Sequence, residues 1–328
     1  MSFIAWTEIT QFANIRKYLK AYPEVCPNQK VTYKGKVKLH GTNAAIQCLS
    51  NGQLVAQSRE SILTLEKDNF GFARFVDSNK TKLQEINTKF GDLILFGEWC
   101  GKGIQNGVAC SDIPTKSFFV FAAGKIKEDK VDQFIVEPDE LSKIVEGIKD
   151  VYVIPWHCEL EVDFSKSDEE LQAKVEELNT LVKQVEECDP LIKQLFNVSG
   201  VGEGLVMQPS SQEHLGYENY KNLVFKAKGD KHQVKKVKAP VQVAIEQVSG
   251  VKEFVDMFVT EQRLKQGLSV VCGDKFEQKF IGSFVQWMTK DVEKESKDEL
   301  EKSGLKYSDV SKEVVNASKK WYLSNLGK

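Results

Sequence analysis

The sequence of 328 residues has no long hydrophobic run, and no stretch approaches the ~18–20 consecutive apolar residues that span a bilayer. Residues 1–8 also lack the basic segment followed by an apolar run that marks an export signal. From these two absences we expect no membrane partner and a cytoplasmic location.

An excess of charge of one sign is missing as well. The 45 Lys and Arg residues nearly balance the 47 Asp and Glu residues, and the net charge is −2 at pH 7. This balance excludes a protein whose whole surface attracts nucleic acid, although it leaves room for a local basic track. The hydrophobic fraction of 41% and the charged fraction of 28% are typical of a soluble globular chain.

Residues that bind metals or form disulfides are few and scattered. The seven cysteines are odd in number and include no CxxC pair, and the four histidines lie far apart in the chain. This pattern argues against a disulfide framework and against a zinc site. It fits a protein that works in a reducing interior.

The length of the chain and its changes of pattern predict two domains, residues 1–240 and 241–328. Apolar runs of strand length recur in the first domain, and Asn51-Gly52 between two of them is a strong hairpin signal. The second domain shows apolar residues at helical spacing throughout.

Two helices and a linker are expected from local signals. Residues 68–90 have the pattern of one helix between strands. Ser167 followed by Glu170 is a capping box that predicts the start of a helix, and Pro190 either closes this helix or opens a short second one. The basic run 226–238 has no apolar periodicity and is interpreted as the end of the first domain plus a linker.

A lysine before a glycine turn, Lys38 with Gly41, is the first candidate for chemistry. Glycine lets the backbone approach a phosphate closely, and the lysine amine can contact that phosphate. The KxxG spacing alone is weak evidence, because it also occurs at Lys226 and Lys279. The run 200–204 is GxGxG rather than GxGxxG and precedes no helical pattern, so a dinucleotide site is not indicated.

The full segment Lys38-Leu39-His40-Gly41-Thr42-Asn43 closely resembles the nucleotidyl-lysine motif of ATP-dependent RNA ligases. It is similar in particular to the nick-sealing type found in phage RNA ligases and kinetoplastid RNA-editing ligases, within the covalent nucleotidyltransferase superfamily. Further segments resemble the family's other motifs in the expected order: residues 57–59, 96–105, 118–121, 203–206 and 226–228. The resemblance covers residues 30–235.

The resemblance implies a role for each matching residue. The catalytic residues would be Lys38, Glu203, Lys226 and Lys228, with Glu203 also contacting the metal. The residues that bind the nucleotide would be Val37, Lys38, His40, Gly41, Asn43, Arg59, Glu98, Phe121, Lys226 and Lys228. Among them, Glu98 would hold the ribose and Phe121 would form the floor beneath the adenine.

The resemblance also implies a fold and a reaction. The fold would be α+β: an ATP-grasp-like nucleotidyltransferase domain of antiparallel sheets flanked by helices, followed by a small all-helical C-terminal domain. Lys38 would take AMP from ATP with Mg²⁺ or Mn²⁺, and AMP would pass to a 5′-phosphate before a 3′-hydroxyl seals the ends. The expected partners are RNA ends, in nicked duplex RNA or an RNA/DNA hybrid, and the expected state is a monomer.

The chemistry of Lys38 is consistent with this role. Forming a phosphoramidate needs a neutral amine, whereas a free lysine titrates near pH ~10.4. A divalent metal and the neighbouring lysines 226 and 228 are therefore expected to lower the pKa of Lys38.

Two positions depart from the family pattern, and two alternatives stay open. The family often has Asp where this sequence has Ala122, and Lys where it has Gln208. A DNA ligase or a capping-type guanylyltransferase shares most of these motifs, although those enzymes usually carry Asp in place of His40. A non-catalytic protein that binds nucleic-acid ends with a ligase fold is the other alternative.

Overall fold

The computed structural model describes residues 2–7, 9–10, 12–228, 251, 254–255, 257–297, 300 and 306–326. It divides the chain into two compact units, Met1–Leu65 with Phe70–Gly229, and Glu66–Asn69 with Asp230–Lys328. The predicted boundary at residue 240 and most of the predicted linker 226–238 lie outside the described residues. Within the ranges described, no helix is both long enough and apolar enough to cross a membrane.

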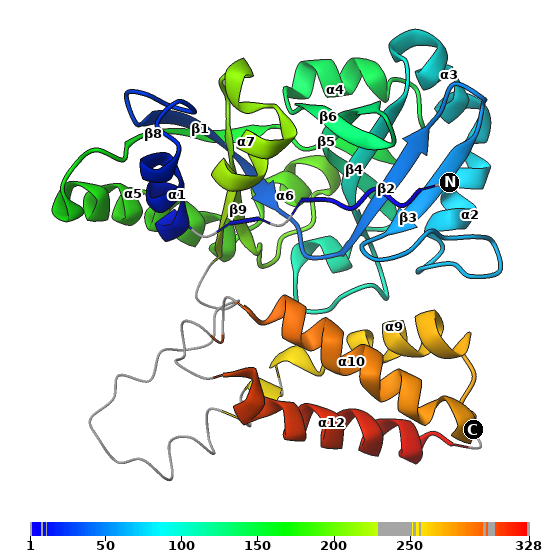
Figure 1. The fold of residues 1–328 in the computed structure, drawn as a ribbon. Helices are drawn as coiled ribbons and strands as arrows, with labels where there is room; N and C mark the ends of the chain where they lie inside the picture. Colours follow the sequence, from blue (N-terminus) through cyan, green and yellow to red (C-terminus); the bar gives the residue numbers. More distant parts are fainter. Residues whose placement is uncertain are drawn as a thin grey trace, which may run out of the picture. The chain divides into compact units, whose positions relative to one another are not determined.

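The first unit contains two sheets that lie side by side in Figure 1. The smaller sheet has the order β10-β9-β1-β8, and all of its pairs are antiparallel. Its strands are β1 (Lys30–Lys38), β8 (Trp156–Asp163), β9 (Gly204–Pro209) and β10 (Phe225–Lys228).

The larger sheet has the order β3-β2-β4-β5-β6, and β7 pairs with β5. This last pair is parallel and the others are antiparallel. Its strands are β2 (Thr42–Cys48), β3 (Leu54–Ser58), β4 (Leu93–Cys100), β5 (Ser117–Lys127), β6 (Lys130–Ile135) and β7 (Val151–Val153). The predicted antiparallel sheets and the Asn51-Gly52 hairpin between β2 and β3 are confirmed.

The helices of the first unit pack on these sheets. Buried side chains of α1, α5 and α6 share a core with the smaller sheet, and those of α2, α3 and α4 share a core with the larger one. The bounds are α1 (Phe12–Ala21), α2 (Phe72–Ser78), α3 (Lys80–Phe90), α4 (Pro138–Ile144), α5 (Asp168–Glu187), α6 (Pro190–Phe196) and α7 (Tyr217–Leu223).

The local helix signals are largely confirmed. The Ser167 hydroxyl accepts from the Glu170 N–H, the Glu170 carboxylate accepts from the Ser167 N–H, and α5 begins at the next residue. Pro190 opens a second helix, α6, rather than only closing α5. The single helix predicted over residues 68–90 is wrong, because the chain leaves helical geometry at Asn79 and forms α2 and α3.

Among the described residues of the second unit, three helices longer than two turns pack around an apolar core that includes Phe284 and Val314. They are α9 (Glu261–Cys272), α10 (Ile281–Glu295) and α12 (Tyr307–Ser324).

The strand connection that matters for the site is the one between β1 and β2. Strand β1 belongs to the smaller sheet and ends at Lys38, whereas β2 belongs to the larger sheet and begins at Thr42. The three residues between them therefore carry the chain from one sheet to the other. The lysine-glycine turn singled out in the sequence thus lies where the two sheets meet.

Gly204 at the start of β9 has a conformation that side chains rarely adopt. Its φ is 146°, and an added Cβ would lie 2.2 Å from the carbonyl oxygen of Ala227 on β10. We expect Gly204→Ala to destabilise the protein by about 2–4 kcal/mol, because both backbone strain and a backbone clash oppose it. Denaturant unfolding would measure this loss. The control is Gly216→Ala, where nothing lies within 4 Å of the added Cβ; it should cost less than about 1 kcal/mol, and an equal loss in both would contradict the argument.

Candidate active site

A row of lysines covers one face of the smaller sheet. Lys38 on β1 is opposite Gly204 on β9, and Gly204 is opposite Lys228 on β10. The next row on the same face holds Lys36, Val206 and Lys226, because side chains alternate along a strand. The structure thus brings three predicted catalytic lysines, residues 38, 226 and 228, onto one surface.

Glu203, which directly precedes β9, is the carboxylate at the centre of this surface. Its side chain is 3% exposed and accepts from the Lys38 amine, with Nζ 2.6 Å from Oε2. The Lys228 amine lies 3.3 Å from the other carboxylate oxygen, and His40 Nδ1 lies 3.6 Å from Oε2. Four residues that the sequence places in three separate motifs therefore form one charged cluster.

The cluster changes the ionisation of its members. Burial alone would raise the pKa of Glu203, but the charges of Lys38 and Lys228 hold that pKa well below its usual range. Burial alone would lower the pKa of Lys38, but the carboxylates of Glu203 and Glu98 raise it. The expectation of a lowered Lys38 pKa is therefore wrong for the protein without nucleotide, because these two carboxylates outweigh burial and the neighbouring cations.

A carboxylate whose pKa is depressed by folding makes stability depend on pH. Glu203 stabilises the folded protein fully above its unfolded pKa of ~4.3, and this contribution is lost as the pH falls toward the lower folded pKa. On acidification, the free energy of unfolding of wild type should fall more than that of Glu203→Gln. The difference should be about 1.4 kcal/mol for each unit by which folding lowers the pKa of Glu203. Unfolding between pH 7 and pH 3 would measure the difference. If the free energies of unfolding of the two proteins changed equally with pH, this role of Glu203 would be contradicted.

The turn between β1 and β2 is held by one side chain of β4 and two from the segment between β4 and β5. The Gly41 N–H donates to Glu98 Oε1 at 2.9 Å, and Gln105 Nε2 donates to the Gly41 carbonyl at 3.1 Å. The Cys110 thiol donates to the His40 carbonyl at 3.3 Å. An added Cβ at residue 41 would lie 2.4 Å from the carbonyl oxygen of Trp99, so a larger residue does not fit the turn. The turn is fixed in the conformation that places Lys38 beside Glu203.

Glu98 lies within electrostatic range of this cluster. Burial raises the pKa of Glu98 to about 7, although the charge of Lys38 opposes the change. Asn43 is opposite Glu98 in the β2–β4 pair. Arg59 is exposed just after β3, and its charge acts on both Lys38 and Glu98. The structure therefore gathers these predicted nucleotide-binding residues around Lys38.

Val37 and Phe121 differ in what they offer a nucleotide. The Val37 side chain is buried in the core of the smaller sheet, so only its backbone can contact a ligand. Phe121 on β5 is half-buried, and its ring packs edge-on against Trp6, with centroids 4.8 Å apart. The two residues that depart from the pattern of the resembling family, Ala122 and Gln208, are both buried.

Three residues that contact the site were not predicted to belong to it: Lys36, Gln105 and Cys110. Gln105 lies inside a matching motif, so its position was a usable signal. Lys36 precedes Lys38 by two residues and therefore shares its strand face, which period-2 spacing alone would have indicated. Cys110 had no signal in the sequence, because it reaches His40 only through the folding of residues 101–116.

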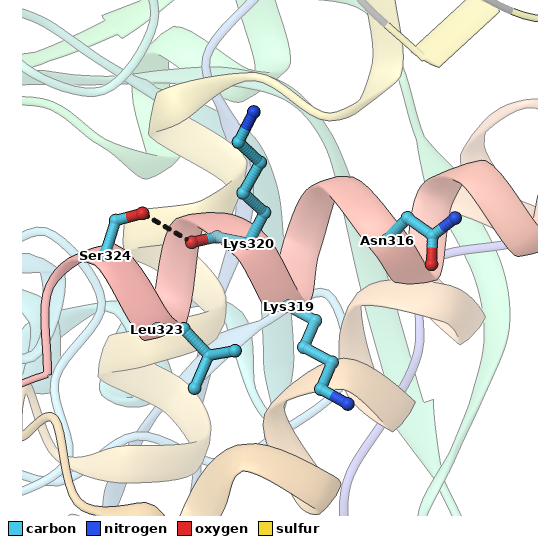
Figure 2. A pocket seen from close by; sticks show the side chains of 5 residues that line it. All are labelled: Asn316, Lys319, Lys320, Leu323 and Ser324. Atoms are coloured by element: carbon cyan, nitrogen blue, oxygen red, sulfur yellow. Dashed lines mark hydrogen bonds between the residues drawn. The ribbon is translucent and has the colours of Figure 1, made fainter.

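A second candidate surface is a shallow hollow on α12, far along the chain from the charged cluster. It is lined by Asn316, Lys319, Lys320, Leu323 and Ser324, and Figure 2 shows these side chains along one helix. None of the five is acidic, so the two lysines give the hollow a positive charge.

A family model described as RNA ligase matches residues 32–228. No curated protein matches the chain.

Three solved structures of Naegleria gruberi RNA ligase are similar to this chain. A mutant with ATP and Mn has a TM-score of 0.48 and 19% identity, and the match covers 71% of this chain and 57% of that chain. The ligase with PPi has a TM-score of 0.46, 19% identity and coverages of 71% and 58%. A mutant with AMP and Mn has a TM-score of 0.46, 18% identity and coverages of 71% and 58%. The chain thus spans less than two thirds of the length of these proteins.

Proposed function

Because the chain belongs to the RNA ligase family, we propose that it is an ATP-dependent RNA ligase that joins 5′-phosphate and 3′-hydroxyl ends through a lysyl-AMP intermediate. The observation that carries this proposal is the contact between Lys38 and Glu203 at 2.6 Å, on a sheet face lined by further lysines. A buried carboxylate that orients a lysine amine beside other cations is suited to attack on a phosphate.

The first step of the proposed reaction, the transfer of AMP to Lys38, begins in the charged cluster around Glu203. The Lys38 amine attacks the α-phosphorus of ATP, the new N–P bond forms, and the bond to pyrophosphate breaks. The Lys38 ammonium must first lose a proton to solvent, and Glu203 orients the amine through the hydrogen bond that it accepts. Lys226 and Lys228 face the same surface and would offset charge on the phosphates. Glu98 would accept from the ribose hydroxyls, and Phe121 would lie against the base.

A divalent ion, Mg²⁺ or Mn²⁺, fits this site through Glu203. Mg²⁺ is usually held by one or two carboxylates together with substrate phosphates. Within the described ranges no group of three or more His, Cys, Asp or Glu residues could hold a metal by itself. Glu203 and the phosphates of ATP would therefore hold the ion, which when bound offsets the negative charge of those phosphates.

The proposed substrate is a nick in duplex RNA or in an RNA/DNA hybrid. The test is a sealing assay with wild-type protein, ATP and metal on a duplex nicked between a 3′-hydroxyl and a labelled 5′-phosphate. The proposal is supported if strands with an RNA 3′-hydroxyl are joined. Fewer strands should be joined when the 3′-hydroxyl belongs to DNA or when GTP replaces ATP. A preference for DNA ends would favour a DNA ligase, and a preference for GTP a guanylyltransferase. Binding to the nick without any covalent AMP would favour a non-catalytic end-binding protein.

We further propose that the C-terminal residues from 241 onward help to hold the RNA, with the hollow on α12 contacting phosphates. Replacing Lys319 and Lys320 together with alanine is expected to weaken RNA binding about 3–10-fold at low salt and to reduce the salt dependence, because fewer counterions are released. Adenylylation should not change. Fluorescence anisotropy with labelled RNA at several salt concentrations would measure the effect.

The control for this double variant is Lys265→Ala with Lys279→Ala. These two lysines are already paired with carboxylates, at 2.9 Å from Glu261 and 2.7 Å from Glu277. Their removal should leave RNA binding nearly unchanged. Equal losses in the two double variants would contradict a specific role for the hollow.

A further inference from the structure

Lys36 is a buried lysine beside the proposed nucleophile. The residue is 1% exposed, and no other lysine among the described residues is buried. It lies on β1 two residues before Lys38, so both side chains leave the same face of the strand. A buried ammonium is costly unless its donors are satisfied, and an apolar side chain of similar size would avoid that cost. Lys36 therefore calls for an explanation other than core packing.

The contacts of Lys36 join the two sheets of the first unit. Its amine donates to the Phe121 carbonyl at 2.7 Å on β5, and to the Val136 carbonyl at 2.6 Å just after β6. The amine also lies 4.5 Å from the centroid of the Trp156 ring on β8. Burial lowers the pKa of Lys36 to about 7, although the charge of Glu137 opposes the change. One side chain thus connects the strand of the nucleophile to the larger sheet.

The Phe121 carbonyl is available to Lys36 because β5 is irregular at this residue. In the β4–β5 pair, Gly97 is opposite Val120 and Phe96 is opposite Ala122, so Phe121 is an extra residue without a partner on β4. On the other edge of β5, pairing with β7 ends at Val120 and pairing with β6 begins at Ala123. Phe121 therefore forms a β-bulge, a feature that redirects a side chain.

A second bulge lies on β8, opposite Lys36. In the β1–β8 pair, Gly35 is opposite Cys158 and Lys36 is opposite Trp156, which leaves His157 as the extra residue. The Lys36 side chain thus reaches from a position opposite the β8 bulge to the carbonyl of the bulged Phe121 in the other sheet. Because the backbone at a bulge is not fixed by regular pairing, this hydrogen bond restrains where Phe121 lies relative to β1.

We propose that Lys36 is a positioning residue for nucleotide binding, which fixes the ring of Phe121 relative to the amine of Lys38 through its hydrogen bond to the Phe121 carbonyl. This inference rests on the proposed function, in which Phe121 contacts the base and Lys38 attacks the phosphate. Lys36 itself touches neither the base nor the phosphate. It acts through Phe121, and its loss should affect binding of ATP more than the reaction of bound ATP.

The test compares Lys36→Met with wild type in single-turnover adenylylation over a range of ATP concentrations. We expect KM for ATP to rise on the order of 10–100-fold, while the rate at saturating ATP stays within about threefold. The control is Lys34→Met. Lys34 shares the strand face, but its amine pairs with the Glu137 carboxylate at 3.4 Å rather than with β5. The KM of Lys34→Met for ATP should equal that of wild type.

A double-mutant cycle distinguishes positioning through Phe121 from a general structural effect. If Lys36 acts through Phe121, Lys36→Met should raise KM much less in a Phe121→Leu background than in wild type. Additive effects, or an unchanged KM in the single variant, would overturn the proposal. Lys36→Gln, which keeps an N–H donor, is the second variant. If neither Lys36 variant folds, the lysine is a structural requirement and the proposal is wrong.

The wild-type reaction separates this inference from the proposed function. If wild type forms no AMP adduct, the proposed function fails. If wild type forms the adduct and Lys36→Met has a normal KM, only the inference about Lys36 fails.

Discussion

Lys38→Met is expected to abolish the covalent AMP adduct while leaving the protein folded. The variant removes the amine that we propose attacks the α-phosphorus, and losing a nucleophile lowers rates by about 10⁴-fold or more. The fold should survive because Glu203 keeps Lys228 at 3.3 Å and His40 at 3.6 Å, so its carboxylate stays partnered. Labelling with α-labelled ATP and metal would measure the loss, and thermal unfolding would check the fold.

The control for Lys38→Met is again Lys34→Met, which removes a lysine from the same strand face at a position that pairs with Glu137. It should label like wild type. Normal labelling of Lys38→Met would show that another residue is the nucleophile. Loss of labelling in both variants would point to a general effect of removing positive charge from this sheet.

Glu203→Gln is the second change with a large expected effect. It leaves the Lys38 and Lys228 amines near each other without the carboxylate that both now contact. Breaking a buried ion pair by removing one partner costs about 3–5 kcal/mol, so we expect a clear loss of stability. We also expect adenylylation to fall about 10²–10³-fold, because the variant loses the contact that orients the proposed nucleophile, Lys38.

The pH dependence of Glu203→Gln gives a second readout. In wild type the Glu203 and Glu98 carboxylates raise the pKa of Lys38, so the fraction of neutral amine should grow as the pH rises. Without the charge of Glu203 that pKa falls, and the residual adenylylation should depend less steeply on pH. Rates measured between pH 6 and pH 9 would test this. A steeper dependence in the variant would contradict the assigned role of Glu203.

The matched control is Glu137→Gln, which also removes a carboxylate from a lysine of the same sheet. Glu137 accepts from Trp156 at 2.8 Å and pairs with Lys34 at 3.4 Å, but its side chain is 34% exposed. A partly exposed pair is worth little, about 0–1 kcal/mol. The stability and adenylylation of this variant should therefore stay close to those of wild type.

The local structure of this chain could be predicted because its signals are local. The Asn51-Gly52 hairpin needs only the turn geometry that these two residues favour. The Ser167 capping box needs only a hydroxyl and a carboxylate at the right spacing. The break at Asn79 was missed because the same apolar spacing continues through residues 68–90, and sequence patterns locate helix ends poorly.

The candidate site could be predicted only in part. Its motifs identified Lys38, Glu203 and Lys228, and the structure brings these residues together. The burial of Lys36 could not be predicted, because it depends on a carbonyl at Phe121, 85 residues further along the chain. The raised pKa of Lys38 was missed for a similar reason, since it depends on how close Glu203 and Glu98 lie after folding.

The most direct test of the central claim is to identify the residue that carries AMP. Two lysines of β1 must be told apart. Burial lowers the pKa of Lys36 to about 7, but its amine is held by the Phe121 and Val136 carbonyls. Lys38 has a raised pKa, and its amine contacts Glu203. Wild-type protein would be incubated with ATP and metal, digested, and its modified peptide sequenced by mass spectrometry. AMP on Lys38 is the predicted result. AMP on Lys36, on another residue or on none would contradict the account.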